Sequence, residues 1–182
     1  MSKNIILDNK QLDVSLDRLS CQLAENHNNF KNTVLVGLQP RGKVLCNKIV
    51  NILKDKHSII NIDYGFLDIT FFRDDFRRKD TPLIPSVTNL DFSVENKEVV
   101  LIDDVLFTGR TVRSGLDAIM TFGRPSKVEL LTLIERRFSH HIPIRADYIG
   151  KSIDTIESER VTVNWEEVDG LDQVILHTPE EK

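Results

Sequence analysis

The stretch from Lys97 to Gly115 constrains the fold of this chain more than any other. An apolar, β-branched run at 99–102 leads into two adjacent acids, Asp103 and Asp104, and then through a small-residue turn at 108–111 into a helical pattern. A short apolar run bounded by turn residues predicts a buried strand. The stretch therefore predicts a strand that passes through a loop directly into a helix.

The turn Thr108-Gly109-Arg110-Thr111 is suited to binding a phosphate group. Backbone N–H groups at the start of a helix point outward with the positive end of the helix dipole, and the two threonine hydroxyls add donors. Asp103 and Asp104 should point to opposite sides of their strand, which excludes a close catalytic pair but allows either carboxylate to bind ribose hydroxyls or Mg²⁺. An ordinary turn without a ligand would be the better interpretation only if these residues occurred as isolated pairs.

Length and composition indicate one ordinary globular domain. The chain has 182 residues, of which 40% are hydrophobic and 29% charged, so we expect a single domain over 1–182. No apolar run approaches the ~20 residues of a membrane span, and Met-Ser-Lys-Asn at the N-terminus is not followed by the apolar region of a signal peptide. A cytoplasmic protein is expected.

Cysteine, histidine and charge content give no sign of a metal centre or a nucleic-acid protein. Cys21 and Cys46 lie far apart, so buried and reduced thiols are expected. The five histidines are scattered, and the pair His140-His141 is better explained as loop residues than as an acid–base pair. A net charge of −4 disfavours nucleic-acid binding, although a local basic patch is compatible with it.

The remaining periodicities predict an α/β sheet with helical crossovers. A helix over 8–27 starts at a variant of the capping box, Asp8-x-x-Gln11, and a helix over 111–122 ends at Gly123. The predicted strands cover residues 33–37, 59–70, 128–134, 160–163 and 173–176. Each of the main motifs follows a strand, and ligands of open α/β sheets bind at the carboxyl ends of strands.

A second strand-to-helix turn offers another anion site. Gly37-x-x-x-x-Gly42-Lys43 nearly matches the P-loop of nucleoside-triphosphate hydrolases and kinases. Val44, however, stands where that loop needs Ser or Thr to bind Mg²⁺. The P-loop is therefore the disfavoured alternative.

The central stretch resembles the phosphoribosyl diphosphate (PRPP) motif of type I phosphoribosyltransferases, and its flanks resemble the PyrR family. The flanks are Gly123-Arg124-Pro125-Ser126 and residues 143–151, and the resemblance extends from about Ile6 to Ile175. It implies a central, mostly parallel sheet flanked by helices. It also implies a small hood, from about 135–165 and the N-terminal segment, and a flexible β-hairpin lid over about 70–95. PyrR proteins are uracil phosphoribosyltransferases that in some bacteria also attenuate the pyrimidine operon by binding RNA.

The same resemblance implies a role for each motif. PRPP would be bound by Asp103, Asp104, Val105, Leu106, Phe107, Thr108, Gly109, Arg110 and Thr111. The pyrophosphate loop would be Gln39, Pro40, Arg41 and Gly42, with a cis peptide at Leu38-Gln39. The lid would contribute Arg73, Asp74 and Asp75. The base pocket would contain Arg136, Tyr148, Ile149, Gly150, Lys151 and Val161. Mg²⁺ would accompany PRPP near Asp103 and Asp104.

The chain departs from RNA-binding PyrR proteins on its first helix. Positions that are basic there hold Asp13, Val14, Asp17 and Cys21, and only Arg18 is retained. The loop at 137–141 is one residue longer, and acids in a phosphate-contacting surface repel RNA. We therefore expect a homo-oligomeric transferase that makes UMP and pyrophosphate from uracil and PRPP. An RNA attenuator with secondary catalysis and a transferase for another base are the alternatives.

Overall fold

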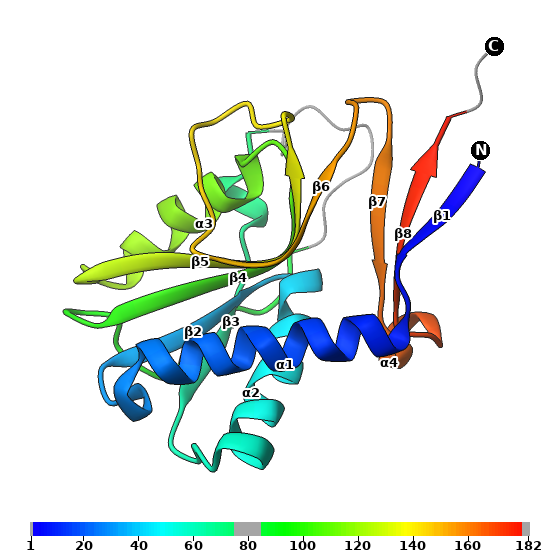
Figure 1. Ribbon diagram of the computed structural model, residues 1–182. Helices are drawn as coiled ribbons and strands as arrows, with labels where there is room; N and C mark the ends of the chain where they lie inside the picture. The colour runs from blue at the N-terminus through cyan, green and yellow to red at the C-terminus, as the bar shows by residue number, and fades with distance from the viewer. Residues whose placement is uncertain (1, 75–84, 180–182) are drawn as a thin grey trace.

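The computed structural model describes residues 2–74 and 85–179, and a five-stranded sheet forms its centre (Figure 1). All neighbouring strands are parallel, in the order β3-β2-β4-β5-β6. They are β2 (Thr33–Leu38), β3 (Asp63–Leu67), β4 (Glu98–Leu106), β5 (Lys127–Arg137) and β6 (Tyr148–Asp154). The chain leaves β2 for β3 on one side and returns to β4 on the other. The crevice between the carboxyl ends of β2 and β4 is therefore the switch point at which such sheets bind ligands.

Helices cover both faces of this sheet. Helices α1 (Asn9–Asn26) and α2 (Arg41–His57) lie on one face and α3 (Arg110–Ile119) on the other (Figure 1). The capping box expected at the start of α1 is formed, because the backbone N–H of Gln11 donates to Asp8 Oδ1 at 2.8 Å and that of Asp8 donates to Gln11 Oε1 at 3.1 Å.

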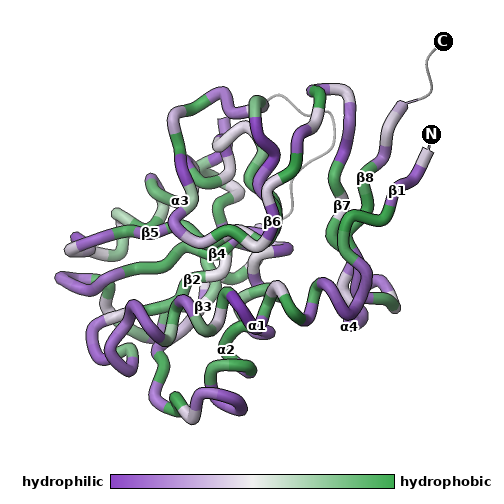
Figure 2. The backbone as a smooth tube through the Cα atoms, in the orientation of Figure 1, coloured by the Kyte–Doolittle hydropathy of each residue, from purple (hydrophilic) through white to green (hydrophobic). Residues whose placement is uncertain are grey.

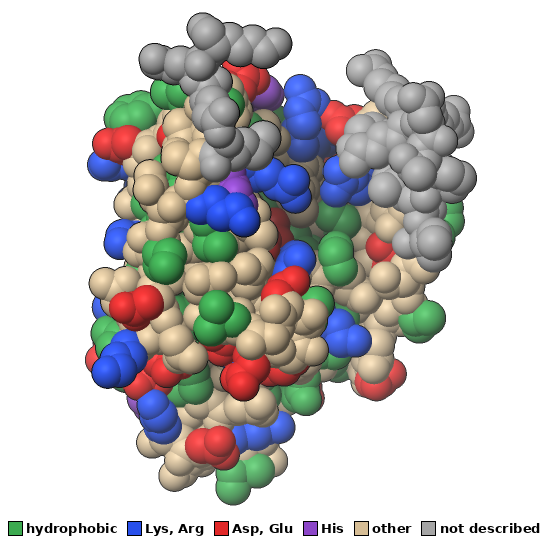
Figure 3. Space-filling model, turned by 90° about the vertical axis from the view of Figure 1, so that its right-hand side faces the viewer, with side chains coloured by type: hydrophobic (Ala, Val, Ile, Leu, Met, Phe, Trp, Pro, Cys, Tyr) green, Lys and Arg blue, Asp and Glu red, His purple; other side chains and the backbone are tan. Residues whose placement is uncertain are grey.

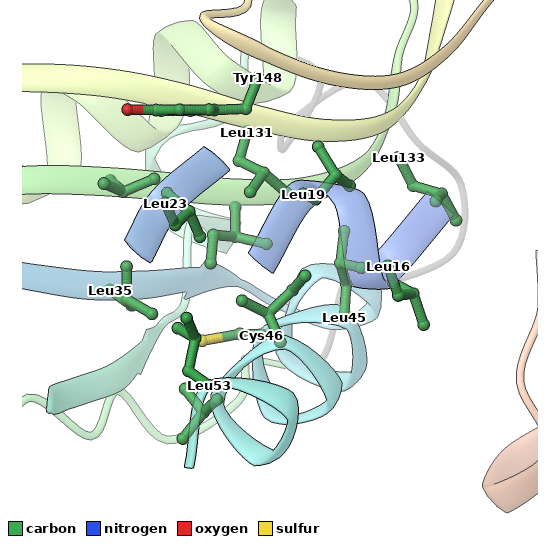
Figure 4. Packing of buried hydrophobic residues seen from close by; sticks show 14 of the residues in the cluster. Leu16, Leu19, Leu23, Leu35, Leu45, Cys46, Leu53, Leu131, Leu133 and Tyr148 are labelled. Carbon is green, nitrogen blue, oxygen red and sulfur yellow. The ribbon is translucent and has the colours of Figure 1, made fainter. Parts of the chain in front are cut away.

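Leucines at helical spacing fasten α1 and α2 to the sheet. Leu16, Leu19 and Leu23 of α1 point toward Leu45 and Leu53 of α2, as Figure 4 shows. Along β4, Val100 and Ile102 pack on this side, whereas Val99 and Leu101 pack on the side of α3. A parallel sheet covered on both faces has continuous apolar strands, and the apolar colouring of β2 and β4 in Figure 2 follows this rule.

A second, antiparallel sheet of three strands stands beside the first. It has the order β1 (Ser2–Leu7), β8 (Gln173–Thr178), β7 (Arg160–Asn164), with α4 (Glu166–Asp169) between β7 and β8 (Figure 1). Its inner face is buried through Val163, Val174 and the adjoining Trp165. This sheet contains β8, which lies outside the expected hood range, and residues 135–137 and 148–154 belong instead to the larger sheet.

Short 3-10 helices follow three of the main elements, at Asn28–Phe30, Thr70–Phe72 and Met120–Phe122. The strand expected over 59–70 is the shorter β3, Asp63–Leu67. The segment expected to form the lid, from about residue 70, follows it closely. Within the described part of that lid, Asn89 pairs with Phe66 of β3 through two backbone hydrogen bonds of 2.8 and 2.9 Å. The middle of the lid, with Asp75, lies outside the described residues.

The two cysteines differ in their environments. Cys46 is buried in the core, where burial raises its pKa to about 12, but Cys21 is exposed on α1, so the expectation of two buried thiols is wrong for Cys21. A polar face of α1 that points away from the core explains this exposure. No helix in the described part of the chain is long and apolar enough to cross a membrane.

Candidate functional site

The turn between β4 and α3 forms an open helix N-terminus. Gly109 is the N-cap residue, with φ 85° and ψ −6°, a left-handed conformation that favours glycine. It has no side chain with which to cap the first turn of α3, and the N–H of Arg110 makes only a long hydrogen bond of 3.4 Å to Thr108 Oγ1. The N–H groups at such a helix start point outward and can bind an anion. Thr108, Gly109, Arg110 and Thr111 thus form the turn that leads from β4 into α3.

A loop distant in sequence holds this turn in place. The backbone N–H groups of His141 and Ile142 donate to the carbonyl of Thr108 at 3.0 and 3.2 Å. A Cβ atom at Gly109 would lie 3.4 Å from Ile142 Cβ and 3.4 Å from Ile144 Cδ1. The sequence did not predict the contact between residues 141–144 and the turn at 108–109, because no local pattern in 141–144 indicates which distant segment these residues pack against.

The carboxylates of Asp103 and Asp104 interact, contrary to the expectation that they point apart. The backbone N–H of Asp104 donates to Asp103 Oδ1 at 3.0 Å. Ile102 and Val105 pack against the same core cluster, although strict alternation would place residues three positions apart on opposite faces. Strict alternation is therefore lost over the two acids. Burial and then the charge of Asp104 raise the pKa of Asp103 well above its usual range. Burial also raises the pKa of Asp104 to about 6, opposed by backbone hydrogen bonding and by the charge of Arg41.

The turn before α2 meets these acids at the switch point. A Cβ atom at Gly42 would lie 2.2 Å from the carbonyl oxygen of Ile102, so only glycine allows α2 to start this close to β4. Arg41 Nη1 donates to Asp169 Oδ2 at 2.8 Å and to the carbonyl of Val163 at 3.0 Å, which joins the turn to the small sheet.

The cis peptide of this turn lies one bond later than expected. It joins Gln39 to Pro40, not Leu38 to Gln39, and a bond that precedes proline has a much smaller preference for trans than other peptide bonds. The side chain of Gln39 donates from Nε2 to the carbonyl of Val87 at 2.8 Å. The turn is thereby tied to the described end of the lid.

A pocket of about 440 Å³ opens over the turn between β4 and α3. Most of the residues that line it come from the central motif and the lid: Arg73, Asp74, Asp103, Val105, Leu106, Phe107, Thr108, Gly109, Arg110, Thr111, Val112 and Ser114. Arg110 is 51% exposed and its guanidinium is paired with the carboxylate of Asp74. The charge of Arg73 lowers the pKa of Asp103, against the larger effect of burial. The pocket thus combines an anion-binding turn with a buried carboxylate.

Comparison with known proteins gives the family. Residues 2–167 match the family described as phosphoribosyl transferase domain. The Bifunctional protein pyrR of Enterococcus faecalis is 39% identical over 176 residues, covering 97% of each chain. The Bifunctional protein PyrR of Fusobacterium nucleatum is 41% identical over 174 residues, covering 94% of this chain and 96% of the relative. The chain belongs to the PyrR family. It is a phosphoribosyltransferase of the type I superfamily.

Solved structures agree with this fold. A hypoxanthine phosphoribosyltransferase from Staphylococcus aureus superimposes with a TM-score of 0.70 at 21% identity, covering 94% of this chain and 89% of that one. The HGPRT-ase from Leishmania tarentolae in complex with GMP reaches a TM-score of 0.73 at 12% identity, covering 97% of each chain. These likenesses show the shared architecture of the PyrR family and the purine enzymes.

Of the residues expected in the base pocket of this PyrR-family chain, Arg136 lies against the motif. Its guanidinium carbon stands 3.8 Å from the ring centre of Phe107, which lines the pocket. Arg136 Nε donates to Thr155 Oγ1 at 2.8 Å and Nη2 to the carbonyl of Ile156 at 2.9 Å. Burial lowers the pKa of Arg136. The side chain joins the wall of the pocket to the chain that leads into β7.

The other expected base-pocket residues do not line the described pocket. Ile149 and Gly150 present their carbonyls to Arg18, Lys151 Nζ donates to the carbonyl of Ile6 at 3.0 Å, and Val161 packs against the core. These residues lie on β6 and β7, where backbone groups rather than side chains could meet a base.

Tyr148 lies at the first residue of β6, at the amino-terminal end of the strand. Its hydroxyl is 3.0 Å from His27 Nε2 and accepts a hydrogen bond from Asn26 at 3.2 Å. The structure therefore does not bring Tyr148 to the pocket, because β4 ends level with Ser152, four positions further along β6.

Proposed function

We propose that this protein is a uracil phosphoribosyltransferase, which transfers the phosphoribosyl group of PRPP to uracil and yields UMP and pyrophosphate. The observation that carries the proposal is the single pocket that contains both the open N-terminus of α3 and the buried Asp103. A ligand with a terminal phosphate and vicinal hydroxyls matches these two features. Uracil as the acceptor is supported by the resemblance to PyrR proteins.

Each part of the pocket has a role in this reaction. The turn at 108–111 holds the 5′-phosphate, Asp103 and Asp104 accept hydrogen bonds from the ribose hydroxyls, and the turn at 39–42 binds the pyrophosphate. Transfer at C1 of the ribose passes through an oxocarbenium-like state, so the protein contributes positioning and electrostatic stabilisation rather than a nucleophile.

The two carboxylates also fit a Mg²⁺ ion that arrives with PRPP. Burial raises the pKa of both, so a cation beside them stabilises their ionised forms. In the described part of the chain no three His, Cys, Asp or Glu side chains could hold a metal by themselves. Mg²⁺ often combines one or two carboxylates with ligand phosphates and water, and Asp103 and Asp104 would supply those carboxylates. When bound, the ion supplies neutralisation of the charge on the leaving pyrophosphate.

The described part of the lid contributes Arg73 and Asp74. Asp74 pairs with Arg110 of the phosphate-binding turn in the free protein, so the two side chains separate when a phosphate binds there. Arg73 is then a cation at the mouth of the pocket that can approach the ligand. Closure of this segment would exclude water from the activated ribose.

The base pocket is proposed to lie between Phe107 and the segment at 149–151. Arg136 positions Phe107 by stacking on its ring. Uracil is neutral, so its two carbonyls and ring N–H need matched donors and acceptors. Backbone groups at 149–151 other than the two carbonyls bound by Arg18, together with those of Val161, can provide them.

An assay of nucleotide formation with several bases tests this proposal. We expect UMP from uracil and PRPP with Mg²⁺, and much slower turnover of orotate, hypoxanthine and guanine. Asp103→Asn is the matched control of low activity, because it removes the charge and keeps the shape. Hypoxanthine or guanine turned over faster than uracil would reject the acceptor while leaving the transferase assignment intact.

RNA attenuation is the second candidate, favoured by the name of the PyrR relatives, and we infer that it is weak in this chain. Three arginines that could bind phosphate have other partners. Arg18 donates to the carbonyls of β6, Arg136 is buried, and Arg137 Nε donates to Asp154 Oδ1 at 2.7 Å. Asp17 Oδ2 of α1 lies 2.6 Å from Lys56 Nζ, so the carboxylate neutralises the positive charge of this lysine. Binding of nanomolar strength to the chain's own pyrimidine leader RNA at physiological salt, strengthened by UMP, would contradict this inference.

We also propose that the protein is a homo-oligomer. α/β domains of this size commonly associate through apolar patches on their surface. Light scattering at micromolar concentration should report a mass that is a multiple of 20.9 kDa. A mass equal to a single chain would reject the proposal.

A further inference from the structure

The outer face of the three-stranded sheet carries a row of basic side chains. In the register of its strands, Lys3 of β1 lies opposite His177 of β8, and His177 lies opposite Arg160 of β7. Directly opposite residues in an antiparallel sheet project from the same face. Val161 and Val163, which alternate with Arg160 along β7, face the core, so the row lies on the side of the sheet away from it.

No ion pair compensates this row within the described chain. Elsewhere lysines and arginines lie against carboxylates, as Lys48 does with Asp172 at 2.9 Å and Lys97 with Asp63 at 2.7 Å. Lys3, Arg160 and His177 form no ion pair with an acid in the described part of the chain. The whole chain has more acidic residues, 28, than basic residues, 24. Three neighbouring basic side chains with no described acid among them therefore differ from the average composition of the chain. Lys3 and Arg160 flank His177 from the two neighbouring strands, so an anion held over His177 is attracted by both cations.

The row borders a hollow of about 420 Å³ that shares no residue with the pocket over the phosphate-binding turn. It is lined by Lys3, Ser158, Arg160, Thr162, Asn164, Ile175, His177 and Pro179. Figure 3 shows the molecule from the side on which this sheet lies, with several Lys and Arg side chains in the upper half of that face. The lining thus combines cations, neutral hydrogen-bonding groups and an apolar surface, with no acid among the described residues that form it.

We propose that this hollow, the β1-β8-β7 site, binds a nucleoside monophosphate outside the transferase pocket. Lys3 and Arg160 flank the phosphate as cations, and the imidazole of His177 between them donates a further hydrogen bond. Ile175 supplies an apolar surface for the nucleoside, and Thr162 and Asn164 supply donors and acceptors for its hydroxyls and base. The volume lies within the ~300–1,000 Å³ of small-molecule sites, and two cations with one histidine suit a single phosphate better than a polynucleotide.

Residue-resolved NMR of the full chain, titrated with UMP, tests the β1-β8-β7 site. Saturable shifts are expected at the amides of Lys3, Arg160 and His177, on a binding curve separate from that of residues 108–112. The double variant Lys3→Gln/Arg160→Gln should weaken the first curve by about tenfold or more and leave the second unchanged. The matched control Lys10→Gln/Arg124→Gln, which removes two exposed cations elsewhere, should change neither curve.

Three results would overturn the proposal. Shifts confined to 108–112, or shifts at the row that persist in Lys3→Gln/Arg160→Gln, would show that the row is a solvated surface. If inorganic phosphate binds at the row as tightly as UMP does, the site recognises phosphate alone and not a nucleoside monophosphate. A short single-stranded RNA bound there far more tightly than UMP would identify a polynucleotide surface instead.

Discussion

Both ends of the five-stranded sheet bury polar side chains, but the two clusters differ in how their members are satisfied. At the amino end, His27 is enclosed by Thr33 Oγ1 at 3.0 Å from Nδ1, and by Tyr148 Oη at 3.0 Å and Glu129 Oε2 at 3.1 Å from Nε2. These residues hydrogen-bond one another and leave little for a ligand to add. Such a network stabilises a fold.

At the carboxyl end, the acids of β4 are only partly compensated, by backbone hydrogen bonds such as that from the N–H of Asp104 to Asp103 Oδ1 at 3.0 Å. Burial raises the pKa of Asp103 and Asp104, and the charges of Arg73 and Arg41 offset it only in part. Gly109 caps none of the N–H groups at the start of α3, and that of Arg110 has only the long hydrogen bond of 3.4 Å to Thr108 Oγ1. The comparison shows that an incompletely compensated polar cluster, more than a buried polar cluster as such, marks the site of binding.

Gly109→Val should have the largest effect at the carboxyl end. The residue would have to adopt φ near 85° and place its side chain against Ile142 and Ile144, at the position of the phosphate-binding turn. We expect affinity for PRPP to fall by about a hundredfold or more, at a cost in stability of about 1–3 kcal/mol. Calorimetric titration with PRPP, with circular dichroism as the check on folding, measures this. Unchanged affinity in a folded variant would remove the turn from the site.

Asp103→Asn should come next. The carboxylate lines the pocket and its charge is proposed to act on the ribose, so kcat/KM should fall by roughly 10²-fold while the protein remains folded. Steady-state assays with varied PRPP provide the measurement. Normal turnover by both this variant and Asp104→Asn would contradict the ribose role.

Tyr148→Phe should affect the amino end alone. Loss of the hydroxyl removes its contacts with His27 and Asn26, and we expect the free energy of unfolding to decrease by about 1–2 kcal/mol. KM for uracil and kcat should remain within about twofold of wild type, since the side chain is remote from the pocket. A large change in KM for uracil would place Tyr148 in the base pocket after all.

Asp104→Asn should make the protein more stable, in a pH-dependent manner. Burial raises the pKa of Asp104 to about 6, from about 3.9 in an unfolded chain, so the folded state binds the proton more tightly. Stability is therefore lost as the pH rises between these two values, and the loss is complete above them. The variant should raise Tm by about 3–5 °C near pH 7.5 and by little near pH 4. A pH-independent difference in Tm would show that the charge is not the cause.

Asp74→Asn should have the smallest effect. The substitution removes the ion pair between Asp74 and Arg110. The phosphate of the ligand competes with Asp74 for Arg110, and this pair is well exposed, so its contribution is small. We expect KM for PRPP to decrease by about two- to fivefold with kcat unchanged. An increased KM would mean that Asp74 assists binding instead of competing with it.

Local patterns in the sequence predicted the elements that carry the central motif. The apolar run before Asp103, the turn at Thr108 and the amphipathic stretch after it specified a strand, a turn and a helix, because each is fixed by interactions a few residues long. The order of these elements also indicated a parallel sheet with its motifs at the carboxyl ends of strands, and five parallel strands are observed.

Contacts between distant segments could not be predicted in the same manner. Alternation along β4 suggested that Asp103 and Asp104 point apart, but Val105 packs against the cluster that contains Ile102, so the alternation of faces is broken between them. The position of Tyr148 at one end of β6, away from the pocket, likewise depends on the register of β6 with β5. Register is set by the packing of whole strands and leaves no signal at a single residue.

By itself, the sequence determined the strand, turn and helix of the phosphate-binding motif, because backbone conformation and helix dipole are properties of consecutive residues. The tertiary structure alone decided what surrounds that motif: the loop at 141–144 that supports Gly109, the approach of Gly42 to Ile102, and the row of Lys3, His177 and Arg160. Each of these joins segments far apart in the chain, and such neighbours are selected by the packing of one core rather than by any local preference.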